Sequence, residues 1–137
     1  MAEAIRADLC VIGAGSGGLT VAAGASQMGA EVVLIESDKM GGDCLNYGCV
    51  PSKALLAAAN TAQGIRGAGA FGVDGHEPAI DFARVHDHVH EIIARIAPND
   101  SQERFESLGV TVIRARASFT SPKEVRAGDA HLSPGTH

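Results

Sequence analysis

The 137-residue chain has no tryptophan, only 4% aromatic residues and just three cysteines. An odd, small number of cysteines does not build an extracellular disulfide framework. No apolar run approaches the ~18 to 20 residues of a membrane span, and residues 1–15 lack the pattern of a signal peptide. The 11 Lys and Arg are outnumbered by 16 Asp and Glu, giving a net charge of −5 without a dense basic block. Neither nucleic-acid binding nor membrane insertion is therefore expected, and we expect a cytoplasmic protein.

Hydrophobic residues make up 45% of the sequence, which at this length predicts one compact domain. Residues 7–12 form an apolar run that ends at a glycine and suits a buried strand. A helical pattern rich in Ala and Gly follows over 16–28, and a second apolar run spans 32–35. Strand, helix and strand within about thirty residues predict one βαβ unit of an α/β fold.

The rest of the chain is organised around further helices and strands. Asp81 begins a helix whose apolar stripe runs from Phe82 to Ile96, and Asp100 with Glu103 predicts a capping box for the next helix. In chain order, the expected segments are a cysteine-containing loop and helix at 40–63, a glycine-rich surface loop at 64–78, a helical excursion at 81–108, a third strand at 110–115 and a truncated hairpin or tail at 117–137.

The first apolar run leads into a glycine turn with the pattern G-x-G-x-x-G at Gly13, Gly15 and Gly18, and Ser16 begins the following helix. Glycines at these positions permit a tight turn, the approach of a pyrophosphate and close packing of helix on strand. Glu36 lies 23 residues after Gly13, where a carboxylate can bind a ribose and would repel a 2′-phosphate. The alternative is a glycine-rich turn with a solvated Glu36. The turn alone does not distinguish NAD from FAD.

Two cysteines, Cys44 and Cys49, stand five positions apart just before Pro51, which suits the first turn of a helix. A helix N-terminus stabilises a thiolate, and a redox disulfide needs one sulfur that leaves readily as a thiolate. A structural disulfide and a zinc site are the alternatives. Neither is favoured, because the chain has no secretory features and no second Cys/His pair at finger-like spacing.

Two further groups of possible ligands are given structural interpretations. Cys10 lies inside the first apolar run and is interpreted as a small buried residue. His86, His88 and His90 are closely spaced, but only the outer two share a helix face and no third ligand is evident. We therefore predict no metal site from the sequence.

The segment GAGSGG, then Glu36, then GGDCLNYGCVPSKAL resembles the N-terminus of the flavin-dependent pyridine nucleotide–disulfide oxidoreductases. Within this family the similarity is greatest to dihydrolipoyl dehydrogenases and mercuric reductase-like enzymes. The resemblance implies a three-layer α/β, Rossmann-like FAD-binding domain over residues 1–137, incomplete because the NAD(P) and dimerisation domains are missing. It also implies that the glycine turn holds the FAD pyrophosphate, Glu36 the ribose, and Gly41 and Gly42 the backbone beside the phosphates.

The same resemblance assigns roles to the two cysteines. Cys44 would be the interchange thiol that meets the substrate, and Cys49 the charge-transfer thiolate beside the flavin. Lys53 matches a family lysine near the flavin ring. Asp43 departs from the threonine of many relatives, and a carboxylate beside phosphates is repulsive unless it is paired or points away.

The resemblance also implies a reaction and its partners. Electrons would pass between NAD(P)H, FAD and the Cys44–Cys49 disulfide, to or from a dithiol such as dihydrolipoamide, in a homodimer. The alternatives are a mercuric reductase-like enzyme, another disulfide reductase, and a non-enzymatic truncated module that binds nucleotide or exchanges thiols. A truncated domain of this kind is expected to bind FAD weakly or not at all by itself.

Overall fold

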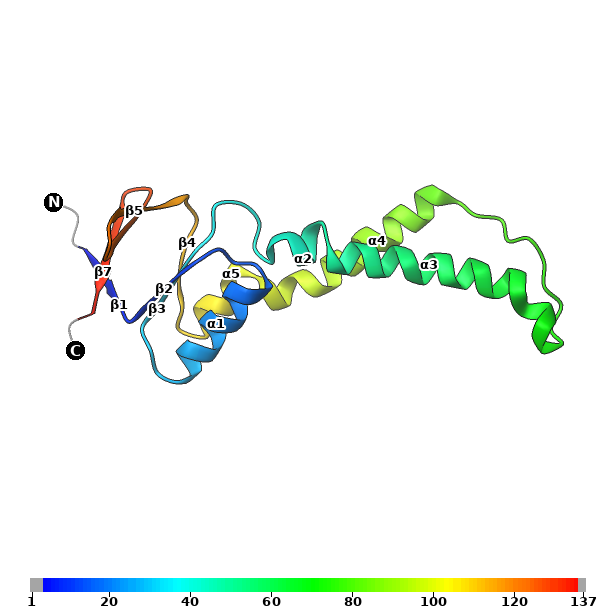
Figure 1. Ribbon diagram of the computed structural model, residues 1–137, viewed down its shortest axis with the longest axis horizontal. Helices are drawn as coiled ribbons and strands as arrows, with labels where there is room; N and C mark the ends of the chain where they lie inside the picture. The colour runs from blue at the N-terminus through cyan, green and yellow to red at the C-terminus, as the bar shows by residue number, and fades with distance from the viewer. Residues whose placement is uncertain (1–3, 136–137) are drawn as a thin grey trace.

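A computed structural model describes residues 4–135, so the ends of the predicted domain, residues 1–3 and 136–137, lie outside the described residues. Two small sheets form one end of the molecule, and a pair of long helices extends from it (Figure 1). In chain order, the elements are β1 Ile5–Ala7, β2 Leu9–Ile12, α1 Ser16–Gln27, β3 Val32–Ile35, α2 Gly42–Asn46, α3 Cys49–Gly67, η1 Ala68–Phe71, α4 Phe82–Ile96, η2 Ala97–Asp100, α5 Gln102–Ser107, β4 Thr111–Ile113, β5 Ala117–Ser121, β6 Glu124–Ala127 and β7 Ala130–Pro134.

The parallel sheet has the strand order β2-β3-β4. Its central strand, β3, is buried at all four positions because both of its faces are covered. Val32 and Leu34 pack toward α1 and α5, whereas Val33 and Ile35 pack toward β6 and β7 of the second sheet. Helices, parallel sheet and second sheet therefore make three layers. The α/β, Rossmann-like fold predicted from the sequence is confirmed.

The second sheet has the order β1-β7-β6-β5, with β1 and β7 parallel and the other pairs antiparallel. The prediction of one strand over 7–12 was wrong, because the chain changes sheets at Asp8. There the Asp8 carboxylate accepts a hydrogen bond from the Glu31 N–H (2.8 Å), and the Asp8 N–H donates to the Glu31 carbonyl (2.9 Å). These two bonds hold the break between β1 and β2.

The segment expected as a truncated hairpin at 117–137 contains three strands rather than two. β5 and β6 form the hairpin, and β7 then returns to pair with both β6 and β1, placing Leu132 opposite Val125 and Ile5. Because its partner β1 stands near the start of the sequence, the pattern within 117–137 does not reveal this third strand. Within the described residues, β7 therefore extends the sheet beyond the hairpin.

Residues 49–96 form a helical arm in which α3 runs away from the sheets and α4 returns beside it (Figure 1). The surface loop expected over 64–78 is shorter, because α3 continues to Gly67 and η1 follows. Arg66 and Glu77 form an ion pair at 2.5 Å near the tip of the arm. No residue of α4 is fully buried, although the helix begins and ends where the sequence predicted.

The helix caps agree with the sequence in one case and differ in another. The Asp81 carboxylate accepts a hydrogen bond from the Arg84 N–H at the start of α4. For α5 the capping residue is Ser101, whose hydroxyl accepts from the Arg104 N–H, instead of the predicted Asp100. Asp100 is the last residue of η2, so its backbone is already part of a helical turn.

Candidate functional site

The glycine turn (residues 13–18) lies at the carboxyl end of β2, as its motif predicts. Gly13 has a φ of +102°, and its N–H donates to the Ile35 carbonyl (2.8 Å), which extends the parallel pairing by one residue. A Cβ at Gly18 would overlap the Gly13 carbonyl oxygen and lie 3.2 Å from Val11 Cγ1. Glycine is therefore required at position 18 for α1 to pack on β2.

The N-terminus of α1 presents backbone donors at this turn. The Leu19 N–H bonds to the Gly15 carbonyl (2.9 Å), so the N–H groups of Ser16 and the two residues after it precede the intrahelical ladder. A Cβ built at Gly15 meets no atom within 4 Å, so the space beside it is open. Free N–H groups, the helix dipole and open space together fit the pyrophosphate of a dinucleotide.

Glu36 follows β3 and is 9% exposed. Among the described residues, it is the one polar or charged residue that is buried. Its Oε2 accepts from the Ala14 N–H (2.7 Å) and its Oε1 from the Asp38 N–H (2.7 Å). These bonds hold the carboxylate directly beside the glycine turn. Because each carboxylate oxygen has a second lone pair, Glu36 can still accept a hydrogen bond from a ribose hydroxyl.

The segment carrying the two cysteines (residues 41–49, the thiol segment) is docked on the glycine turn. The Gly41 N–H donates to the Ala14 carbonyl (2.9 Å), and a Cβ at Gly42 would lie 2.7 Å from Gly15 Cα. Both glycines have positive φ angles, +88° and +58°. Only glycine combines this backbone conformation with so close an approach.

The structure brings Cys44 and Cys49 together. Cys44 lies half-buried in α2, and Cys49 is the exposed first residue of α3; both are free thiols. The Gly48 N–H donates to the Asp43 carbonyl (2.6 Å), which turns the chain between the two helices. Hydrogen bonding to Cys49 raises the pKa of the Cys44 thiol, partial burial adds to the rise, and the charge of Lys53 opposes it.

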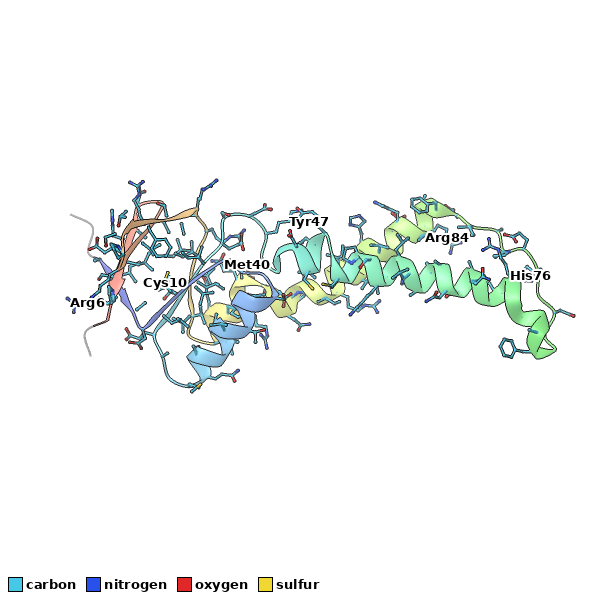
Figure 2. The ribbon with its side chains drawn as sticks, in the orientation of Figure 1. Arg6, Cys10, Met40, Tyr47, His76 and Arg84 are labelled. Carbon is cyan, nitrogen blue, oxygen red and sulfur yellow. The ribbon has the colours of Figure 1, made fainter. Side chains whose placement is uncertain are left out.

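Two charged residues of the predicted site lie on the surface beside the thiols. Asp43 is exposed in the first turn of α2, where a carboxylate interacts favourably with the helix dipole. Lys53 is exposed near the start of α3, and its positive charge acts to lower the pKa of the Cys44 thiol. Lys39 lies over the ring of Tyr47 (5.1 Å from nitrogen to ring centroid), and Tyr47 marks the junction of sheets and arm in Figure 2.

Sequence reasoning missed two residues that hold the site together. The Asn46 side chain donates to the carbonyls of Met40 (3.1 Å) and Gly42 (2.9 Å). These bonds connect the end of α2 to the backbone at its start. Ala14 is fully buried, and its N–H and carbonyl bond to Glu36 and Gly41, respectively. A clue to Ala14 is its place between two motif glycines, whereas Asn46 offers no local signal.

Other candidate ligands lie outside this site. Cys10 is half-buried among the strands (Figure 2), and burial raises the pKa of its thiol. Within residues 4–135, no group of three or more His, Cys, Asp or Glu side chains could hold a metal ion. In the same range, no helix is both long and apolar enough to cross a bilayer.

Comparison with known proteins identifies the family of the chain. The model of the family described as "Pyridine nucleotide-disulphide oxidoreductase" matches residues 7–133. Dihydrolipoyl dehydrogenase of Halobacterium salinarum is 36% identical over 119 residues, covering 87% of this chain and 25% of that protein. Mercuric reductase of Streptomyces lividans is 35% identical over 113 residues, covering 82% of this chain and 24% of that protein. The chain thus spans about a quarter of the length of the curated relatives it matches.

A solved structure supports the fold independently. The Cu(II) complex of the HOCl-induced flavoprotein disulfide reductase RclA from Escherichia coli superposes with a TM-score of 0.71 at 24% identity, over 91% of this chain and 25% of that one. The family model covers nearly the whole chain and includes the glycine turn and both cysteines. The resemblance inferred from the motifs is confirmed: the chain belongs to the pyridine nucleotide-disulphide oxidoreductase family.

Proposed function

We propose that residues 1–137 are part of the FAD-binding domain of an FAD-dependent disulfide oxidoreductase, with Cys44 and Cys49 as its redox-active pair. The observation that carries this proposal is the docking of the thiol segment on the glycine turn through Gly42 and Gly15. An open, amide-lined helix N-terminus beside two neighbouring thiols suits a dinucleotide whose redox ring must reach a disulfide.

The glycine turn would bind the FAD pyrophosphate through backbone N–H groups, and Glu36 would bind the adenosine ribose. Gly41 and Gly42 would let the thiol segment approach the same phosphates without a side chain between them. The glycine turn together with Gly41 and Gly42 is called the phosphate cradle. The exposed carboxylate of Asp43 would weaken anion binding unless it is turned away from this cradle, so we do not assign Asp43 as a ligand. When bound, FAD would exchange an electron pair with the cysteines and with NAD(P)(H).

The two cysteines would do the thiol chemistry. In the oxidised state, a substrate thiolate attacks Cys44 Sγ, the Cys44–Cys49 bond breaks, and its electron pair stays on Cys49 Sγ. The second substrate thiol then attacks the substrate sulfur of the mixed disulfide, which releases the oxidised substrate and leaves Cys44 reduced. Each substrate thiol must give up its proton to a base. We assign no residue of this chain to that task.

Dihydrolipoamide-like dithiols are the substrates that we propose first, because the relatives named dihydrolipoyl dehydrogenase match across most of the chain. Mercuric ion is the second candidate, supported by the similarity to a mercuric reductase. A homodimer and a cytoplasmic location complete the proposal. The location is favoured by the small, odd number of cysteines, which does not suit the disulfide framework of an extracellular protein.

An NMR titration of the reduced, isotope-labelled chain with FAD tests the cradle. Weak binding at millimolar FAD is expected to shift the amide signals of residues 13–18 and 41–49 together. Gly15→Ala is the decisive variant: its Cβ meets no protein atom within 4 Å and its φ of −80° suits alanine. The methyl group would nevertheless enter the space that we propose for the pyrophosphate. We expect affinity to fall about tenfold or more.

Gly24→Ala is the matched control, because it also adds a methyl group to open space in α1 but lies two turns from the cradle. It should bind FAD like the original chain. Equal binding by the Gly15→Ala variant, or amide shifts confined to other regions, would contradict the proposed cradle.

A further inference from the structure

Two histidines on α4 converge outside the site described above. His86 and His90 stand one helical turn apart, and their Nε2 atoms are 3.1 Å from each other. The ring centroids are 4.4 Å apart and the ring planes are inclined by 53°. The His86 side chain is 61% exposed, so an ion in solution can reach it.

The two nitrogens are at hydrogen-bond distance, which is also short enough for both to bind one metal ion. Metal–nitrogen bonds to imidazole are about 2.0–2.1 Å long, so a 3.1 Å separation corresponds to a nitrogen–metal–nitrogen angle of about 98°. This angle lies between the right angle of square-planar sites and the tetrahedral angle. We propose that His86 and His90 chelate one divalent transition-metal ion of the Cu²⁺ or Zn²⁺ class through their Nε2 atoms.

A neighbouring carboxylate favours the required tautomer of His86. Asp87 Oδ1 lies 3.9 Å from His86 Nδ1, so its charge favours a proton on Nδ1 and leaves the Nε2 lone pair for the metal. His90 binds as the same tautomer, and solvent moves its proton from Nε2 to Nδ1. The hydrogen bond between the rings is thereby replaced by two metal–nitrogen bonds, with no change in the net proton count of two neutral rings.

The site would be open, with water completing the coordination. No third His, Cys, Asp or Glu joins the pair within the described part of the chain. Imidazole ligands favour Cu²⁺ over Zn²⁺ at equal geometry, so copper should bind more tightly. His88 lies between the two ligands in sequence but lines the groove between α3 and α4, away from the pair.

The test uses the full chain with all three cysteines replaced (Cys10→Ala, Cys44→Ser, Cys49→Ser), because thiols also bind these metals. Calorimetric titration with Cu²⁺ and Zn²⁺ salts should show one ion per chain, with copper bound more tightly. His86→Ala and His90→Ala should each weaken binding about tenfold or more, whereas His88→Ala should leave it unchanged. Asp87→Asn should weaken it by only about two- to fivefold, because the contact with His86 is long and both side chains are exposed.

Circular dichroism of each variant checks that α4 stays folded. Electron paramagnetic resonance of the copper complex should show two nitrogen ligands, reduced to one in either alanine variant. Unchanged affinity in the His86→Ala or His90→Ala variants, or an equal loss in the His88→Ala variant, would overturn the proposal.

Discussion

Replacement of Gly42 by alanine tests the contact that joins the thiol segment to the glycine turn. The φ of +58° at Gly42 costs an L-residue about 1–2 kcal/mol. The new Cβ would also lie 2.7 Å from Gly15 Cα, and forcing backbone apart by a methyl group in a packed region costs about 1–3 kcal/mol. The two terms add to a loss of about 2–5 kcal/mol in the free energy of unfolding.

Alanine substitutions at two other glycines distinguish the cost of a positive φ from the cost of steric overlap. Gly29 has a φ of +91° but open space around its Cβ, so Gly29→Ala should cost only the conformational part, about 1–2 kcal/mol. Gly24 lies exposed in α1 with open space, and Gly24→Ala should stabilise the helix by about 0.5–1 kcal/mol. Urea unfolding of the reduced chain, followed by circular dichroism, measures all three.

The order of stability should therefore be Gly24→Ala, the original chain, Gly29→Ala and Gly42→Ala. If Gly42→Ala costs no more than Gly29→Ala, the thiol segment does not rest on the glycine turn. Such a result would remove the observation on which the proposed function depends.

Three further substitutions test the charges around the site and the arm. Lys53→Met removes a charge that lowers the pKa of Cys44, so that pKa should rise and alkylation of Cys44 by iodoacetamide should shift to higher pH; an unchanged pH profile would show that Lys53 acts elsewhere. Asp43→Thr should strengthen FAD binding in the NMR titration, because it removes a negative charge from the thiol segment, which we propose to lie near the phosphates. Arg66 lowers the pKa of Glu77 by hydrogen bonding, so their pairing stabilises the arm at neutral pH and is lost as the pH falls through that pKa. Glu77→Gln should thus lower the melting temperature slightly at neutral pH and leave it unchanged in strong acid.

Local signals in the sequence were sufficient for the elements that local physics determines. Both ends of the helix over 82–96 are marked by local residues, a capping aspartate before it and a proline after it. The glycine turn can also be predicted from the sequence, because a tight turn and a close helix contact each require glycine at a fixed position.

Features that depend on distant partners could not be predicted in the same way. The break at Asp8 is held by Glu31, 23 residues away, and β7 forms because β1 lies beside it in space. In the site, spacing identified both cysteines, but the docking of Gly42 on Gly15 joins residues 27 positions apart. Asn46 was missed for another reason: its partners lie only four and six residues away, but they are backbone carbonyls, which carry no sequence signature.

A redox titration of the thiols tests the central claim most directly. The chain is equilibrated in dithiol–disulfide buffers of graded potential, its remaining thiols are alkylated, and the products are mapped by mass spectrometry. Cys44 and Cys49 should disappear together along one two-electron curve as an intramolecular disulfide, while Cys10 stays alkylatable throughout. If Cys44 and Cys49 titrate independently, or form only mixed disulfides with the buffer, the account of a redox-active pair is contradicted.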